Sequence, residues 1–206
     1  MVSQASAAGA EDMKKAKTGR FGKEDWLQLG LAQLAAGGPR ALRITELVDA
    51  AGKTIGSFYH HFADQNDFFD ALVAHWRDTN TVPIMNAVDP LADADQQADR
   101  LTGLATRLDE RVETGIRLYA HENDTAASAV AAVDALRIGY VAQIYQRRFS
   151  ISAEEAERLA QLEYAAFVGT QMVFHQRYRD LAPPLARLFQ GMVGRTYHAE
   201  KSDPAA

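Results

Sequence analysis

The fold is decided by the stretch Leu47-Val48-Asp49-Ala50-Ala51-Gly52-Lys53-Thr54-Ile55-Gly56-Ser57-Phe58-Tyr59-His60-His61-Phe62, which predicts a helix, a tight turn and a short second helix. Gly52 supplies the turn, and Thr54 is a residue type that caps helix N-termini. Both helices carry apolar packing positions, namely Leu47, Val48 and Ala51 before the turn and Ile55, Phe58 and Phe62 after it. The rest of the second helix is small, hydroxylated or imidazole-bearing. This is the pattern of a DNA-reading helix-turn-helix.

Helical periodicity continues on both sides of this stretch, and no segment has the alternation of a strand. We expect helices at residues 24–36, 44–51, from Thr54, from Asp64 through Trp76, at 99–121, 128–148 and 152–178, and after Pro183-Pro184. Gly37-Gly38-Pro39 ends the first of them, and Ser152-x-x-Glu155 is a capping box. Residues 79–98, with two prolines, form a loop or broken helix. The predicted fold class is all-α.

Charge and composition divide the chain into three parts. The net charge is −5, yet Lys14, Lys15, Lys17, Arg20 and Lys23 form a block free of acidic residues. We therefore expect a disordered basic arm at residues 1–22, a DNA-binding module at 23–76 and a helical domain at 77–206, for which the family resemblance given below implies effector binding and dimerisation. The arm either follows DNA phosphates or is only a solubilising terminus.

Several classes of protein are disfavoured by what the sequence lacks. There is no cysteine, so disulfides, thiolate catalysis and cysteine zinc sites are excluded. No apolar run approaches the ~20 residues of a membrane span, and the N-terminus has no signal-peptide core. No nucleophile-and-base pair, phosphate loop or dinucleotide motif occurs. We expect a cytoplasmic protein that is not an enzyme and needs no cofactor or metal.

The stretch Ala51-Gly52-x-Thr54-x-Gly56-Ser57-Phe58-Tyr59-His60-His61-Phe62 resembles the signature of the TetR/AcrR transcriptional regulators. The resemblance is strong from about Trp26 to Trp76 and weaker at residues 117–137 and 154–169. Two positions depart from it, since Lys53 stands where a valine is usual and Gln65 where a basic residue is usual. The resemblance implies a homodimeric DNA-binding protein, most often a repressor, that a small-molecule effector releases from double-stranded operator DNA.

The predicted DNA contacts are divided by the chemistry of their side chains. Residues of the first turn are expected at the bases, and later ones and the helix N-termini at phosphates. The residues predicted to contact bases are Ile55, Gly56 and Ser57. The other residues predicted to contact DNA are Arg43, Lys53, Thr54, Tyr59, His60, His61 and Gln65. The alternatives are a core role for Ile55, a packing role for Gly56 and a solvated Ser57.

The second half of the chain is rich in aromatic residues at helical spacing, which either form core or surround a ligand pocket. We expect a cavity faced by Trp76, Tyr119, Tyr140, Phe167 and Gln171. The last two predicted helices carry small residues near Gly169 and an apolar stripe. These features either complete the core of one subunit or, as the resemblance implies, pair two subunits. The alternative function is a helical ligand-binding or protein-interaction domain without functional DNA binding.

Overall fold

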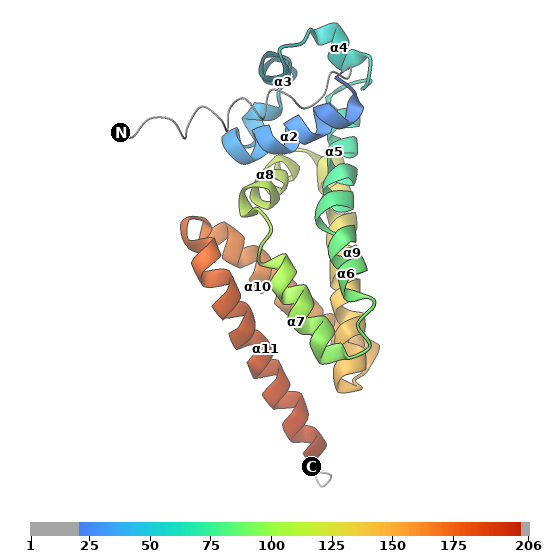
Figure 1. The fold of residues 1–206 in the computed structure, drawn as a ribbon, viewed down its shortest axis with the longest axis vertical. Coiled ribbons are helices and arrows are strands. Elements are labelled where there is room, and N and C mark those ends of the chain that lie inside the picture. Colours follow the sequence, from blue (N-terminus) through green and yellow to red (C-terminus); the bar gives the residue numbers. More distant parts are fainter. Residues whose placement is uncertain (1–20, 203–206) are drawn as a thin grey trace, which may run out of the picture.

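The computed structural model describes residues 21–202, with side chains described as far as Tyr197, and this part of the chain is all-α (Figure 1). The elements are α2 (Lys23–Gly37), η2 (Pro39–Leu42), α3 (Ile44–Ala51), α4 (Ile55–Tyr59), α5 (Gln65–Asn80), α6 (Val82–Val88), α7 (Ala94–Ala105), α8 (Glu110–His121), α9 (Asp124–Phe149), α10 (Ala153–Val173), η3 (His175–Arg177) and α11 (Tyr178–Ser202). The molecule is elongated, with α3 and α4 at one end and the end of α11 at the other. The predicted basic arm falls almost entirely outside the described residues.

The helix boundaries predicted around the turn are confirmed because their caps are local. Thr54 Oγ1 accepts the Ser57 amide at 3.2 Å, and Asp64 Oδ1 accepts the Asp67 amide at 2.9 Å. Arg43 precedes α3 without a side-chain cap, as its residue type predicts. Sequence-local hydrogen bonds of this kind can be recognised without knowledge of the tertiary fold.

A fully buried aromatic cluster holds the N-terminal helices together. Phe58 of α4 lies 5.5 Å from Trp26 of α2 and 5.4 Å from Phe68 of α5, measured between ring centroids. Phe62 completes the cluster at 5.1 Å from Phe58. Edge-to-face and tilted pairs at these distances add to the burial of large apolar surfaces. The short helix α4 therefore has a rigid base, although so few residues would not hold a helix in isolation.

The prediction of one helix over residues 99–121 is wrong, because α7 ends at Ala105 and α8 begins at Glu110. Asp109 caps α8 by accepting the Arg111 amide at 3.1 Å. The apolar spacing continues across the break because both helices turn apolar faces inward, so periodicity alone did not reveal the change of direction. Helix α9 also starts earlier than predicted, since Asn123 Oδ1 caps it by accepting the Ala126 amide at 3.0 Å.

The prolines do not precede the last helix, as predicted, but lie inside α11. Tyr178 and Ala182, in the turn before them, are buried, and this packing offsets the amide hydrogen bonds that two prolines cannot make. The helix before it, α10, correspondingly ends at Val173 rather than at residue 178. Tertiary packing here prevails over a local preference of proline for the first helical turn.

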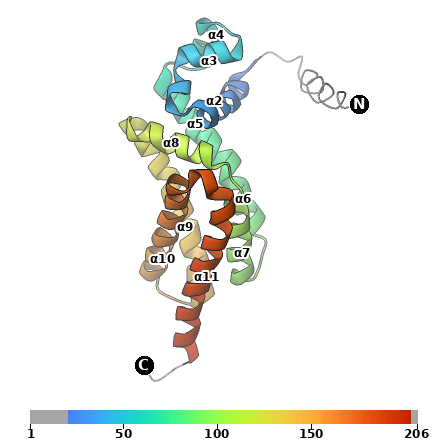
Figure 2. The ribbon, with the colours of Figure 1, turned by 90° about the vertical axis from the view of Figure 1, so that its left-hand side faces the viewer.

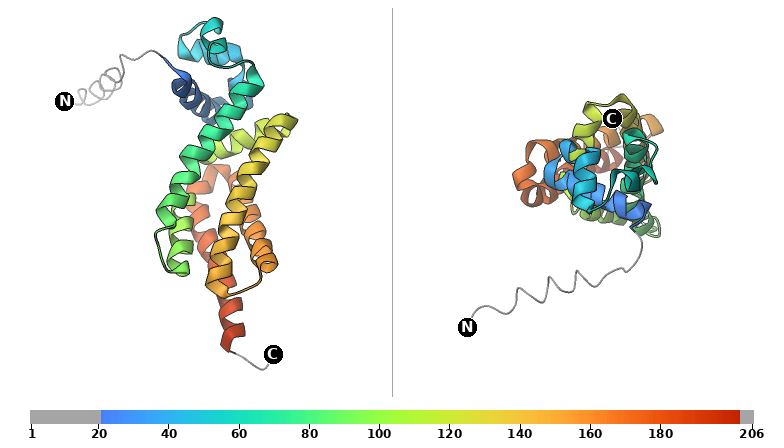
Figure 3. Two further views of the ribbon diagram at one scale, coloured as in Figure 1. Left: turned by 90° about the vertical axis from the view of Figure 1, so that its right-hand side faces the viewer. Right: turned by 90° about the horizontal axis from the view of Figure 1, so that it is seen from above.

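Helix α9 is the centre of the larger bundle and packs against α5, α7, α8 and α10. Figure 3 shows it beside α5 along one flank of the molecule. By length and composition alone α9 is apolar enough to cross a membrane, but its contacts with the other helices and its partly buried ion pairs give it a role inside the bundle. Asp134 and Arg137 of α9 form two of these pairs.

The N-terminal module meets the bundle through close helix contacts on α2 and α5. A Cβ atom added at Gly115 of α8 would lie 2.6 Å from Leu34 Cγ, so only glycine permits this approach of α2 to α8. Phe69 of α5 stacks on Tyr119 of α8 with ring centroids 4.1 Å apart. Movement of α5 or α8 is therefore transmitted to the N-terminal helices by direct contact.

Candidate nucleic-acid interface and internal cavity

The turn before α4 needs a glycine. Gly52 has φ 60° and ψ 37°, a left-handed conformation that side-chain-bearing residues rarely adopt. The amide of Lys53 then closes on Val48 O at 3.0 Å. This geometry ends α3 and fixes the direction in which α4 leaves the turn.

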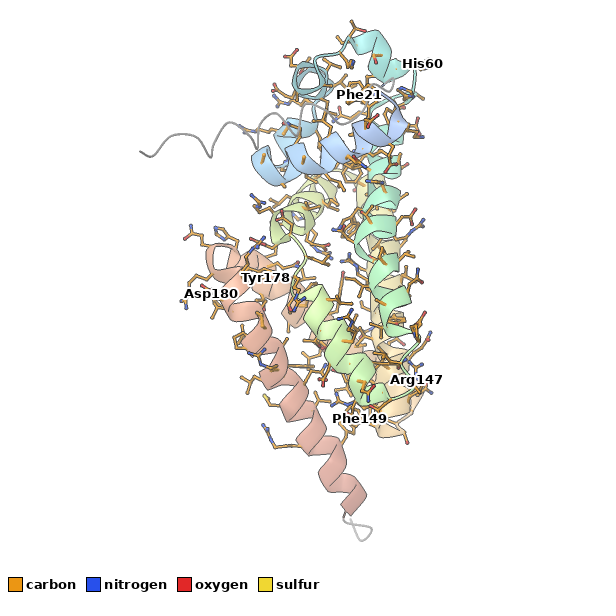
Figure 4. All side chains as sticks on the ribbon, viewed as in Figure 1. Phe21, His60, Arg147, Phe149, Tyr178 and Asp180 are labelled. Carbon is orange, nitrogen blue, oxygen red and sulfur yellow. The ribbon has the colours of Figure 1, made fainter. Side chains whose placement is uncertain are left out.

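One face of α4 is anchored and the other is open to solvent. Phe58 is fully buried, whereas Ile55 is 50% exposed and Tyr59 is 51% exposed. The exposed set also includes Lys53, Thr54, Gly56 and His60, with Ser57 and His61 half-buried. Figure 4 places His60 at the outer end of the molecule, above Phe21. Ile55 is therefore not part of the core, which corrects its assignment to the packing face.

A shallow groove of about 320 Å³ runs between Phe21 and the residues that precede and form α4. Its lining consists of Phe21, Lys53, Thr54, Gly56, Ser57, His60 and His61. The ammonium of Lys53 lies 5.4 Å from the centroid of the Phe21 ring, within cation–π range. The segment before α2 and the recognition residues thus share one concave surface.

Gly56 has a different role from Gly52. A Cβ atom at Gly56 would meet Thr54 Oγ1 at 3.8 Å, an ordinary contact, and its backbone dihedral is not in the left-handed region. The fold of the free protein does not require glycine here. What glycine provides is open space in front of the α4 backbone.

Arg43 and Gln65, at the N-termini of α3 and α5, differ in orientation. Arg43 is exposed. Gln65 instead points inward, where Nε2 donates to Leu42 O at 3.4 Å and to Tyr119 Oη at 3.3 Å. Its side chain links α5 to α8, which argues against the DNA contact predicted for Gln65.

An apolar cavity of about 140 Å³ lies between the end of α5 and helices α6, α7, α9, α10 and α11. Tyr140 and Phe167 line it, as predicted. Hydrophobic lining also comes from Ile84, Met85, Leu101, Val141, Leu185 and Phe189, and polar lining from Asn80, Thr81, Thr106, Arg137, Glu163 and Tyr164. A concave apolar site with a few polar groups is the usual form of a small-molecule pocket.

Trp76, predicted at the cavity, is not among the residues that line it. The side chain is fully buried, and its Nε1 donates to Glu113 Oε1 at 2.8 Å. The Arg137 guanidinium lies 4.4 Å from the Trp76 ring centroid, between the tryptophan and the cavity. The indole N–H therefore has a carboxylate partner in the core, behind the residues that line the cavity.

Tyr119 and Gln171 are also displaced from their predicted positions at the cavity. Tyr119 stacks on Phe69 at the junction of α5 and α8. Gln171 is buried near Tyr178, at the far end of α10. Helical spacing placed these residues on inward faces correctly, but it does not distinguish the core from a cavity wall.

Two ion pairs behind the cavity were not predicted. Arg137 donates to both oxygens of Glu113, at 2.8 and 3.2 Å, and Arg117 donates to both oxygens of Asp134, each at 2.8 Å. Tyr164 joins them by donating to Asp134 Oδ1 at 2.7 Å. Although burial acts in the opposite direction, the bonds from Arg117 hold the pKa of Asp134 below its usual value. The sequence feature that could have revealed these ion pairs is the presence of charged residues on helix faces predicted to point inward.

An apolar surface is left open along α10 and α11, which lie side by side in Figure 2. Its exposed members are Leu162, Met172, Val173, Phe174, Leu185, Leu188 and Met192. A Cβ atom at Gly169 would meet nothing within 4 Å, so this glycine is not needed for packing within the chain. Several large apolar side chains exposed on two neighbouring helices favour an interaction surface over an inert one.

Comparison with known proteins agrees with this geometry. The model of the family described as "Bacterial regulatory proteins, tetR family" matches residues 27–72. The HTH-type transcriptional repressor KstR2 of Mycobacterium tuberculosis is 33% identical over 87 residues, which are 42% of each chain, so less than half of that relative is matched. A transcriptional regulator from Rhodococcus sp. has a similar fold (TM-score 0.72, 16% identity, 84% of this chain and 96% of that chain). The fatty acid degradation regulator FadR of Bacillus halodurans is also similar (TM-score 0.66, 12% identity, 84% and 96%).

Proposed function

We propose that this protein belongs to the TetR family and is a cytoplasmic transcriptional repressor, which binds a palindromic operator as a homodimer and releases it when a small molecule occupies the cavity. The observation that carries the proposal is the geometry of α4. Phe58 packs this short helix against the core, whereas Ile55, Gly56 and Tyr59 are exposed to solvent. A helix of this construction enters a major groove without rearrangement of its own core.

The recognition surface has two kinds of contact. Ile55 offers an apolar group to a thymine methyl, and the open backbone at Gly56 allows close approach to the bases. Tyr59, His60 and Lys53 carry hydrogen-bond donors suited to phosphate oxygens. Phosphate contacts set affinity and register, whereas contacts of Ile55, Gly56 and Ser57 set sequence preference.

Dimerisation through α10 and α11 follows from the exposed apolar surface there. Leu188 is 57% exposed and Met192 is 53% exposed on a helix that otherwise has a buried face. Pairing of α10 and α11 with their copies would cover this surface in a four-helix arrangement. The same symmetry would present two α4 helices to the two halves of a palindrome.

Release is supported by the position of the cavity relative to α5. Asn80 ends α5, Thr81 follows it, and both line the cavity. Arg137 touches the cavity on one side and Glu113, the partner of Trp76, on the other. A ligand that changes these contacts biases the position of α5, and α5 packs against α2 of the DNA-binding module.

Titration of the dimer with the DNA upstream of its own gene, at a series of salt concentrations, tests this function. We expect specific binding whose affinity falls steeply as salt rises, since released counterions drive phosphate binding. Binding that does not distinguish this DNA from an unrelated duplex would favour the alternative, a helical ligand-binding or interaction domain without operator recognition.

A further inference from the structure

Arg137, which lines the cavity, and Arg117 behind it are both paired, so neither has a charge left for an anionic ligand. Arg137 makes a two-bond ion pair with Glu113, and Arg117 makes another with Asp134. Arg137 Nε is also occupied, because it donates to Thr81 Oγ1 at 2.9 Å. Breaking a buried pair to bind a carboxylate would leave an unpaired charge behind, at a cost that exceeds the gain.

Glu163 is a further carboxyl group at this wall, and its described contacts are with uncharged donors. Its Oε1 accepts from Gln190 Nε2 of α11 at 2.6 Å, and its Oε2 accepts from Tyr145 Oη of α9 at 2.9 Å. Among the ion pairs of the described residues, none includes Glu163. The cavity therefore has a surplus carboxyl and no surplus cation.

The groups that face Glu163 from neighbouring helices determine the direction in which its pKa is shifted. Burial raises the pKa of Glu163, and this outweighs the hydrogen bonds from Tyr145 and Gln190 and the charge of Arg148. Arg148 of α9 has other partners, because its Nε donates to Asp95 Oδ1 of α7 and its Nη1 donates to Gln190 Oε1, each at 2.5 Å. Burial raises the pKa of Tyr145 as well, so this phenol stays protonated and donating.

We propose that the effector is a small apolar amine, whose ammonium group pairs with Glu163 while its hydrocarbon body packs against Tyr140, Phe167 and Phe189. The proposal rests on the proposed function for the role of the cavity and adds the chemical class of its ligand. A cavity of about 140 Å³ is close in size to a dry apolar cavity of about 150 Å³ that holds benzene. One ring with a short alkylammonium chain is therefore of suitable size.

The pairing makes binding depend on pH in a defined direction. The amine is protonated in water and the ion pair needs the ionised form of Glu163, so at any pH below the pKa of Glu163 binding releases a proton. Affinity for the amine should rise with pH until the pKa of Glu163 in the empty cavity is passed. It should fall again only near the pKa of the amine, at about 10. An uncharged ligand of the same shape should show neither change.

Three compounds with one hydrocarbon body test the class directly, namely phenylpropylamine, phenylpropanol and phenylpropionate. Calorimetric titration of each into the full-length dimer, without DNA, should give the order amine, alcohol, carboxylate. The amine should be favoured over the alcohol by about 10- to 100-fold, the value of a hydrogen bond to a charged partner. Equal binding of amine and alcohol, or tightest binding of the carboxylate, would overturn the proposal.

The variant Glu163→Gln separates the charge from the shape of the pocket. It should lose the preference for the amine and the rise of amine affinity with pH, while affinity for phenylpropanol stays the same. Glu157→Gln removes the same charge from an exposed position of α10 and should leave both intact. An unchanged amine preference in folded Glu163→Gln would contradict the assignment. If that variant does not fold, the order of the three compounds on the wild-type protein decides.

Failure of this proposal and failure of the proposed function have different signatures. Operator binding without any amine preference overturns the ligand class and leaves the repressor function standing. Amine binding that is lost in Glu163→Gln, combined with an operator affinity that the amine does not change, supports the ligand class and overturns release. The two measurements use the same protein preparation.

Discussion

The α4 surface and the cavity wall are built in opposite ways. In α4 the polar groups are exposed, and the helix is positioned by apolar residues behind it, above all Phe58. At the cavity the charged groups are largely buried, and Glu113 accepts hydrogen bonds from both Arg137 and the Trp76 indole. The first surface keeps its donors free for a partner outside the chain. The second keeps Arg137 paired inside the chain, and the effector proposed for it forms one new ion pair, with Glu163, beside these existing contacts.

The largest expected effect comes from breaking the internal pair. Glu113→Ala removes the partner of Arg137 and of the Trp76 indole, and it should destabilise the protein by about 3–5 kcal/mol because a buried charge is left alone. Urea denaturation followed by Trp fluorescence measures this. Asp78→Ala removes an exposed acid that pairs with Arg77 and should cost no more than about 1 kcal/mol. Equal losses in the two variants would show that burial of the pair does not matter.

The next effect concerns the surface that brings two α4 helices together. Leu188→Asp places a charge in the proposed interface and should convert the dimer to a monomer with an unchanged helical content. Leu118→Asp makes the same substitution at an exposed leucine of α8 and should leave the dimer intact. Light scattering with circular dichroism distinguishes these results. A wild-type sample that is monomeric at all concentrations would contradict the proposed symmetry.

A smaller effect is expected at Gly56, where the recognition surface is open. Gly56→Ala should leave stability almost unchanged, since the added Cβ meets no close neighbour. It should nevertheless weaken operator binding by about tenfold, or about 1.4 kcal/mol, by holding the backbone away from the bases. Gly103→Ala, at another open glycine, serves as the control. Unchanged operator affinity in Gly56→Ala would remove α4 from the DNA contact.

The smallest effect separates positioning from specificity within α4. Tyr59→Phe should cost about 0.5–1.5 kcal/mol on every operator variant, since it removes one donor to a phosphate. Ile55→Ala should instead change the preference at one base pair of each half-site. Fluorescence anisotropy on a set of operators with single substitutions compares the two. Parallel profiles for both variants would contradict the division of roles.

How much the sequence reveals differs between the same two regions. The turn at Gly52 and the cap at Thr54 depend on neighbours within a few residues, so the helices there follow from the sequence. The partners Trp76, Glu113 and Arg137 are far apart in the chain, and no local pattern records that they meet. Trp76 was expected at the cavity for this reason. A residue on an inward helix face can lie either in the core or at a cavity wall, and only the tertiary packing decides between them.

The break between α7 and α8 illustrates the same limit for the fold. Leu101, Leu104, Val112 and Ile116 keep one helical spacing across it, although the chain turns between them. Asp109 is the signal that could have located the turn, because an aspartate before a helical run is a good N-cap. The prolines of α11 show the converse, where a strong local signal yields to the burial of Tyr178 and Ala182.

Selection of binding sites from a random-sequence DNA library tests the central claim most directly, because it requires both the α4 surface and the dimer. We expect enrichment of an inverted repeat with two equal half-sites, in which Ile55→Ala alters one symmetric pair of positions. Enrichment of no sequence, or of a single half-site without its inverted copy, would contradict operator recognition by a symmetric dimer.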